Sequence, residues 1–228
     1  KNPRGLAYFK GGKAYYLYLL QSQTGTYVPV KEIEKRLSRQ LSSEIGIVGN
    51  MLRQNPELLT TLNKGISFTE MRPAQILSSL QKKISSDFPP LEDVSFELKT
   101  VHDSMKDYLS PAFYLTPPMD TGTPNVIYIN PSANYQGLEL FTTLAHEGFP
   151  GHLYQTVTFQ RQKSSNIRNL LCNSGFAEGW ATYIEPYAYQ YAADYIQDPS
   201  ATELARISWL NRSINLCMYS LLDIEILY

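Results

Sequence analysis

The sequence carries almost no net charge and no long apolar run. Its 20 lysines and arginines balance 21 aspartates and glutamates, giving a formal net charge of −1. Nucleic-acid-binding domains usually gather positive charge on one face, so we expect no nucleic-acid partner. No stretch approaches the roughly 20 apolar residues that span a bilayer, and the N-terminal segment lacks the pattern of a signal peptide. The sequence therefore predicts no membrane span.

Cysteine is also scarce, and its placement excludes a structural zinc knuckle. Cys172 and Cys217 lack the paired spacing of such a site, so buried free thiols are expected, although a disulfide between them stays open. The chain begins at Lys1 rather than methionine, and the apolar pattern of its last predicted helix continues nearly to Tyr228. We therefore expect a fragment whose parent chain has further segments at both ends.

Most of the sequence has helical periodicity. Helices are predicted over 12–23, from Pro29 to about 52, between 56 and 65, over 73–85, from 137 into a histidine motif, after 173 and after 198. The second of these carries an apolar stripe at spacings of three and four, which we expect to lie in the core: Ile33, Leu37, Leu41, Ile45, Val48 and Leu52.

Three shorter segments, 94–101, 112–115 and 126–129, favour strands. The elements together predict a predominantly helical α+β protein with a small mixed or antiparallel sheet next to the motif helix. One domain is expected, with a helical lobe over residues 1–90 and a lobe of sheet and motif helices over residues 91–228.

Two of the three histidines flank a carboxylate in the segment HEGFPGH, residues 146–152. In the familiar H-E-x-x-H pattern, about 100° of rotation per residue brings both histidines onto one helix face. Here the second histidine comes six residues after His146, so an unbroken helix would point it elsewhere. Because Pro150 lacks an amide and Gly151 tolerates unusual backbone angles, a local bulge is predicted to return His152 to a shared metal. Alternatively, His146 is a buried polar residue and His152 caps the next segment.

A third metal ligand is predicted downstream, in the segment EGWATYIE. Catalytic zinc sites commonly take two imidazoles and one carboxylate and leave a fourth position open, so Glu178 is the candidate. Asn173 or Ser174 can cap this helix, which would place Glu185 two turns later on the same side. Glu185 is then either a carboxylate partner of a metal-bound histidine or a solvated helix charge.

Two further features receive weaker functional interpretations. The strand Val126, Ile127, Tyr128 and Ile129 is a candidate edge that pairs with an extended substrate, or an ordinary strand. Tyr183, in a tyrosine series that recurs every four residues, either contacts substrate or only packs. The third histidine, His102, has no partner at metal spacing and is expected at the surface or in a cap.

The pair HEGFPGH and EGWATYIE resembles the H-E-x-x-P-G-H and E-G-W-A-x-Y-x-E motifs of a bacterial family, domain of unknown function 885. The resemblance extends over most of the chain, including residues 125–130. That family is grouped with the gluzincins, so the resemblance implies a zincin-like catalytic domain with His146, His152 and Glu178 as zinc ligands and Glu147 as general base. Its members often carry export or lipoprotein signals, which implies an extracytoplasmic or lipoprotein-anchored parent.

One departure from the family pattern lies near the end of the chain. The pattern has an aspartate followed by a glycine and then a histidine, whereas neither follows Asp223 here. No residue that would stabilise an oxyanion is therefore identified.

These residues predict a zinc-dependent peptidase that holds one Zn²⁺ per chain and acts on a peptide substrate. Glu147 would accept a proton from a zinc-bound water and pass it to the leaving amine. Two alternatives stay open. One is a catalytically inactive zincin-like module that binds peptides or has a structural role, and the other is hydrolysis of a non-peptide amide.

Overall fold

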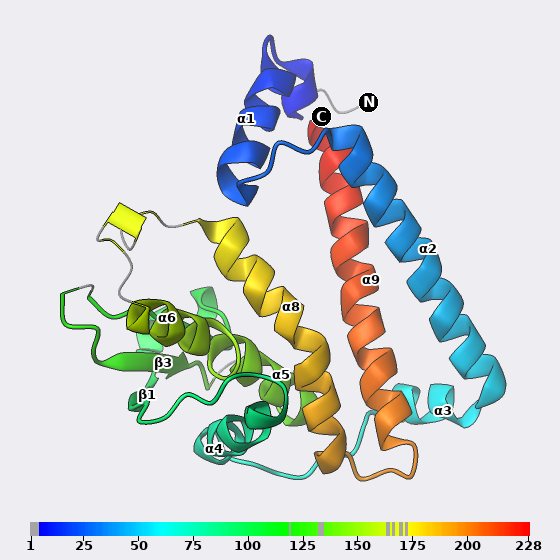
Figure 1. The fold of residues 1–228 in the computed structure, drawn as a ribbon. Helices are drawn as coiled ribbons and strands as arrows, with labels where there is room; N and C mark the ends of the chain where they lie inside the picture. The colour runs from blue at the N-terminus through cyan, green and yellow to red at the C-terminus, as the bar shows by residue number, and fades with distance from the viewer. Residues whose placement is uncertain are drawn as a thin grey trace. The chain divides into compact units, whose positions relative to one another are not determined.

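The computed structural model describes residues 5–118, 120–131, 135–162, 165, 167–168, 171 and 173–228. Helices dominate it and a small sheet accompanies them (Figure 1), which confirms the expected α+β class. The described residues form two compact units. The first contains residues 5–65, 173–176 and 206–228, and the second contains the described residues of 66–171 together with 177–205.

The first unit is helical. It comprises a 3₁₀ turn at Leu6–Tyr8, α1 (Gly12–Thr24), α2 (Val30–Gln54), α3 (Glu57–Lys64) and the part of α9 (Ala201–Leu227) that follows residue 205. Glu32 in the first turn of α2 and Arg53 in its last turn oppose the helix dipole. Arg36 also donates to Glu32 one turn earlier, at 2.9 Å.

The apolar stripe of α2 is less buried than expected. The helix itself is confirmed, but its stripe residues are only partly buried, and Ile45 is 53% exposed. Val30 is the buried residue of this helix. Further along, Gln40 and Glu44 meet Ser213 of α9 through hydrogen bonds of 3.1 and 2.8 Å. Periodicity identified the inward face of α2, but it could not show that polar groups share that face.

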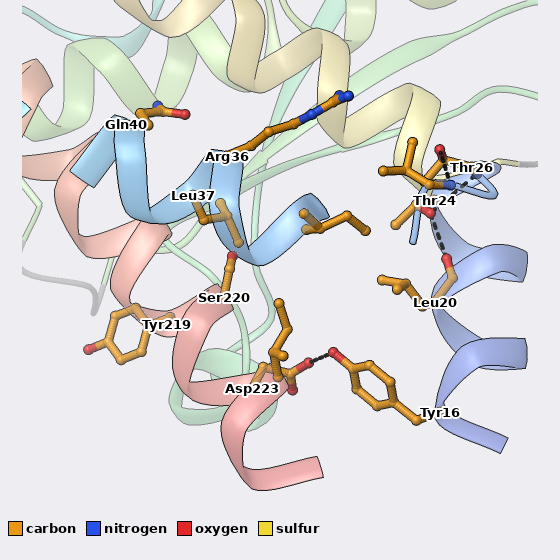
Figure 2. A pocket seen from close by; sticks show the side chains of 13 residues that line it. Tyr16, Leu20, Thr24, Thr26, Arg36, Leu37, Gln40, Tyr219, Ser220 and Asp223 are labelled. Carbon is orange, nitrogen blue, oxygen red and sulfur yellow. Dashed lines mark hydrogen bonds between the residues drawn. The ribbon is translucent and has the colours of Figure 1, made fainter. Parts of the chain in front are cut away.

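A cavity of about 730 Å³ lies among α1, α2 and α9 of the first unit. Figure 2 shows Tyr16 and Asp223 at its edge, where the Tyr16 hydroxyl donates to Asp223 Oδ2 at 2.8 Å. Burial, together with the neighbouring carboxylate, raises the pKa of Tyr16 above its ordinary value. This hydrogen bond therefore ties α1 to the C-terminal part of α9.

The second unit packs helices against a small sheet. Its helices are α4 (Pro73–Lys83), α5 (Gly137–Glu147), α6 (His152–Arg161) and α8 (Ser174–Ala192) from residue 177, with 3₁₀ turns at Ile84–Ser86, Asp103–Tyr108 and Ala193–Tyr195. The strands are β1 (Phe96–Thr100), β2 (Ala112–Leu115) and β3 (Asn125–Ile129). One core joins them, and its largest fully buried side chains are Ile76, Leu77, Leu80, Ile84, Ile127, Phe141, Leu144, Phe149, Leu153 and Ile184.

The sheet is mixed and has the strand order β1-β3-β2. β1 runs parallel to β3, with Phe96 opposite Asn125 and Thr100 opposite Ile129. β2 runs antiparallel to β3, with Ala112 opposite Ile129. β3 is therefore the central strand, and both of its backbone edges are taken by neighbours.

The division of the chain differs from the expected lobes. α4 was expected in a helical lobe that ends at residue 90, but Ile76, Leu77 and Leu80 join the same core as Phe141 and Leu144. The last helix, from residue 206, belongs with the N-terminal helices rather than with the motif helices. The expected lobes grouped helices that are close together in the sequence. The observed units instead contain helices whose apolar faces pack against one another, even where they are far apart in the sequence.

The composition also led to expectations about membrane spans and about the cysteines. Among the described residues, none of the helices combines the length and the apolar character needed to cross a membrane. Cys217 is a buried free thiol, as expected, and burial raises its pKa. Cys172 lies outside the described residues.

Adjacent leucines of α3 provide a test of the burial pattern. Leu58 is 2% exposed and Leu59 is 51% exposed. Leu58→Ala should lower the free energy of unfolding by about 2–5 kcal/mol, because it leaves a cavity. Leu59→Ala should change it by less than about 0.5 kcal/mol. Urea denaturation followed by circular dichroism measures both, and equal losses would contradict the placement of α3.

Candidate metal centre

The histidine motif forms a tight turn between two helices. α5 ends at Glu147 and α6 begins at His152, so the expected bulge inside one helix is instead a four-residue connection. The Gly151 N–H donates to the Ala145 carbonyl at 3.0 Å, and the Tyr154 N–H donates to the Gly148 carbonyl at 3.1 Å. These two bonds carry the chain across Pro150, which has no N–H to donate.

Both glycines of this turn are required by space. A Cβ on Gly151 would lie 1.8 Å from the His146 carbonyl oxygen, and one on Gly148 would lie 2.5 Å from Leu77 Cδ2. The backbone angles of Gly151 are φ −77° and ψ −135°, outside the helical and extended regions, as the sequence predicted. The close approach of α6 to the end of α5 is a second reason for glycine at this position.

The turn brings the two histidines together. Their ring centroids lie 4.8 Å apart, with the ring planes at 89°. Glu178 of α8 reaches both rings, with Oε2 3.5 Å from His146 Nε2 and Oε1 3.6 Å from His152 Nε2. The donor atoms of the three residues all lie within 4.8 Å of one another. The structure therefore brings the two histidines and Glu178 together as predicted, and the binding of a metal by them stays a prediction.

Glu185 lies behind the cluster, two turns after Glu178 on α8. Its side chain is only 5% exposed, and Oε1 lies 3.2 Å from His146 Nδ1. It is thus a buried partner of a histidine and not a solvated helix charge. Burial lowers the pKa of His146, but the hydrogen bond that His146 donates to Glu185 and the nearby carboxylates outweigh it and leave the pKa raised. Burial and the neighbouring His146 lower the pKa of His152.

Glu147 points toward the sheet. Its Oε2 accepts a hydrogen bond of 2.8 Å from the backbone N–H of Tyr114, on β2. Burial raises the pKa of Glu147, although the Tyr114 N–H and His146 oppose that shift. Glu147 is therefore a partly buried carboxylate, fixed by β2 next to the histidine pair. Tyr114 has no motif around it, and sequence reasoning missed it.

The substrate-edge prediction for Val126, Ile127, Tyr128 and Ile129 is wrong. These residues form the central strand β3, whose hydrogen bonds on both sides are used within the sheet. A run of apolar residues indicates a strand, but it cannot indicate which strand is at the edge.

The weaker predictions have mixed outcomes. Tyr183 is 56% exposed and packs against Trp180 and Tyr187, at centroid distances of 5.8 and 5.9 Å. These contacts leave the predicted substrate contact untested. His102 is exposed and caps the 3₁₀ turn at 103–108 by accepting from the Ser104 N–H, as expected.

The same two motifs lie within a long match to a family model. That model is described as "bacterial protein of unknown function (DUF885)" and matches residues 2–226. The chain belongs to this family. No curated protein matches the chain.

A solved structure shares the fold of the DUF885 chain. It is the crystal structure described as "the putative lipoprotein from Colwellia psychrerythraea", with a TM-score of 0.72 and 19% sequence identity. The match covers 93% of the present chain and 40% of the Colwellia chain. The present chain thus corresponds to less than half of that protein's length.

Trp180, the tryptophan of the EGW motif, was not predicted to contact the histidine turn. Its indole Nε1 donates to the Pro150 carbonyl at 2.8 Å. Its position two residues after Glu178 is the signal that could have identified it, because α8 must already lie against the turn for Glu178 to reach both histidines.

Gly151→Ala tests whether the turn depends on a missing Cβ. We expect it to lower the free energy of unfolding by roughly 1–3 kcal/mol or more, because the new methyl group overlaps the His146 carbonyl. Gly179→Ala in α8 is the matched control, since a Cβ there would meet no atom of the described residues within 4 Å. It should stabilise the helix by about 0.5–1 kcal/mol. Urea denaturation compares the two variants, and a Gly151→Ala chain as stable as the wild type would contradict the described turn.

Proposed function

We propose that this chain holds a zinc ion and is the catalytic part of a peptidase that hydrolyses peptide bonds with a glutamate general base. The observation that carries the proposal is the convergence of His146, His152 and Glu178, with Glu147 fixed beside them. Two imidazoles and one carboxylate are a common ligand set of catalytic zinc sites, which leave a further position open.

Two of the donor separations are close to those of a zinc site, and the three donor atoms together lie within 4.8 Å of one another. Ligand atoms bound at about 2.0–2.1 Å in a tetrahedral arrangement lie roughly 3.4 Å apart. The carboxylate oxygens of Glu178 lie 3.5 and 3.6 Å from the two histidine Nε2 atoms. Glu185 engages Nδ1 of His146, which leaves Nε2 directed at the shared space, as in many metal-bound histidines. Glu178 is 63% exposed on its side chain, so the cluster is reachable from solvent.

In this proposal the zinc ion would polarise a substrate carbonyl and acidify a water molecule. Glu147 accepts the proton of the attacking water on its carboxylate and delivers it to the leaving amine. The Tyr114 N–H holds Oε2 of Glu147 at 2.8 Å, so the carboxylate keeps one orientation while the proton is moved. His146, His152 and Glu178 contribute ligand atoms, and Glu185 orients His146.

Among the described residues β2 pairs with β3 on one side, and its other edge is the proposed peptide-binding edge, in place of β3. The Asn130 N–H bonds the Pro111 carbonyl at 2.8 Å, so the alternation of an antiparallel pair points the backbone groups of Ala112 and Tyr114 away from β3. One of these groups, the Tyr114 N–H, already reaches Glu147. An extended peptide added along this edge would therefore run past the general base and the metal ligands.

Glu147→Gln separates metal binding from catalysis. The amide keeps the shape of the side chain but accepts no proton, so zinc content should stay at the wild-type level. Turnover of a susceptible peptide should fall by roughly 10²–10⁴-fold or more. Inductively coupled plasma mass spectrometry measures the zinc, and a fluorogenic peptide library with and without chelator measures the turnover. A Glu147→Gln protein with wild-type turnover would remove Glu147 as the base.

Glu178→Ala is the companion variant with the opposite expected result, loss of bound zinc together with loss of turnover. Because Glu178 is exposed, its removal should leave the fold intact, which circular dichroism can check. Undiminished zinc content in this variant would exclude Glu178 as a ligand. A wild-type protein that retains zinc but cleaves no library peptide would favour a binding module over an enzyme.

We also propose that the parent protein lies outside the cytoplasm, anchored as a lipoprotein. The support is the Colwellia protein, which shares the fold and is described as "the putative lipoprotein". Fractionation of cells that express the parent chain should recover it in the membrane or periplasmic fraction. Recovery with the cytoplasmic proteins would overturn this location.

A further inference from the structure

α8 contacts the histidine turn at three successive points. Glu178 reaches the Nε2 atoms of both histidines, and Glu185 reaches Nδ1 of His146. Between them, Trp180 donates its indole N–H to the carbonyl of Pro150, at 2.8 Å. The two glutamates contact the histidine rings, which are the proposed metal ligands. Trp180 instead contacts the backbone between the two histidines, where no ligand atom is involved.

The indole of Trp180 is held from several directions. It stacks on Tyr154 of α6 with an interplanar angle of 6° and a centroid distance of 6.2 Å. Phe88 meets it edge-on at 5.9 Å. Tyr154 is itself anchored, because its hydroxyl donates to the Pro89 carbonyl at 2.8 Å. The packing of the ring against Tyr154 and Phe88 therefore sets the direction of the indole N–H, independently of its hydrogen bond to Pro150.

The contacts of Trp180 with Pro150 and of Glu178 with His152 together restrict the position of His152. Pro150 lies two residues before His152, and Trp180 lies two residues after Glu178. The bond between Trp180 and Pro150 therefore sets how the start of α6 lies against α8, and with it the separation of His152 Nε2 from the Glu178 carboxylate. Metal ligation tolerates little slack, since a zinc–nitrogen bond is about 2.0–2.1 Å long.

We propose that Trp180 is a positioning residue for the metal centre, which acts through its hydrogen bond to Pro150 and not by touching metal or substrate. This inference rests on the proposed zinc function. It also assigns a role to the tryptophan of the segment EGWATYIE. Glu178, Trp180 and Glu185 of this segment contact different atoms between His146 and His152.

Trp180→Phe tests the proposal, because it keeps an aromatic ring against Phe88 and Tyr154 but has no N–H. We expect zinc affinity, measured by competition with a chromogenic chelator, to fall by roughly 10–100-fold, as for other groups that orient ligands. The visible spectrum of the cobalt(II)-substituted protein should also change, since it reports ligand geometry. A second variant, in which the indole nitrogen of Trp180 is replaced by sulfur, keeps the ring volume and should behave in the same way.

Tyr191→Phe is the matched control. It removes one aromatic hydrogen-bond donor from the same helix, the Tyr191 hydroxyl that bonds Asp87 at 2.7 Å. A general weakening of α8 would lower zinc affinity in both variants, whereas the proposal predicts a change for Trp180 alone. Equal losses in the two variants, or wild-type affinity and spectrum in Trp180→Phe, would overturn the positioning role.

A metal-free measurement keeps this test separate from the proposed function. Amide hydrogen exchange of Gly151 and Tyr154 reports the bonds that close the turn. Exchange should accelerate in Trp180→Phe and stay unchanged in Tyr191→Phe. If the wild type bound no zinc, the zinc proposal would fail, and accelerated exchange would still show that Trp180 holds the turn. Unchanged exchange would overturn that claim whatever the metal result.

Discussion

The candidate site depends on the backbone contact between Gly151 and the end of α5. The Gly151 N–H bonds the Ala145 carbonyl, and the absence of a side chain at Gly151 lets the chain pass against the His146 carbonyl. This contact stops α5 after Glu147 and starts α6 at His152, so six residues of separation become a ring-to-ring distance of 4.8 Å. A continuous helix would place the two histidines about 120° apart around its axis and about 9 Å apart along it. The longer spacing and the proline are thus compatible with a shared metal only through this turn.

α8 supplies the other half of the arrangement, and its three contacts have different physical characters. Glu178 is largely exposed and contributes charge next to the two Nε2 atoms. Glu185 is buried and fixes one histidine ring through Nδ1. Trp180 fixes the backbone between the histidines. Because all three lie within eight residues of a single helix, any rotation of α8 would disturb them together, and α8 therefore acts as a rigid support for the turn.

Sequence reasoning located the parts of the site that repeat at fixed spacing, and it failed where placement depends on distant segments. His146 and His152, and likewise Glu178 and Glu185, are paired by local spacing along the chain. The meeting of α8 with the histidines was predicted on another ground, the third ligand that a catalytic zinc site commonly takes, and the structure brings the three residues together. The edge strand was misassigned because β3 gained neighbours on both sides only through β1, which lies about thirty residues earlier. The apolar stripe of α2 was predicted to lie in the core because periodicity shows which face of a helix points inward, but not how deeply that face is buried. Tyr114 was missed because it acts through a backbone N–H, which every residue except proline possesses.

That backbone contact links the general base to the sheet. Glu147 follows His146 directly in α5, and its carboxylate is held by β2, the strand whose outer edge is proposed to bind peptide. The position of the base is therefore set by the sheet edge, so a peptide that pairs with this edge would be aligned to the base by the same strand. Since the donor is main chain, the contact is insensitive to the side chain at position 114 unless that residue is proline. The phenol of Tyr114 has a separate task, because it donates to Asn125 of β3 at 2.7 Å and holds the two strands in register.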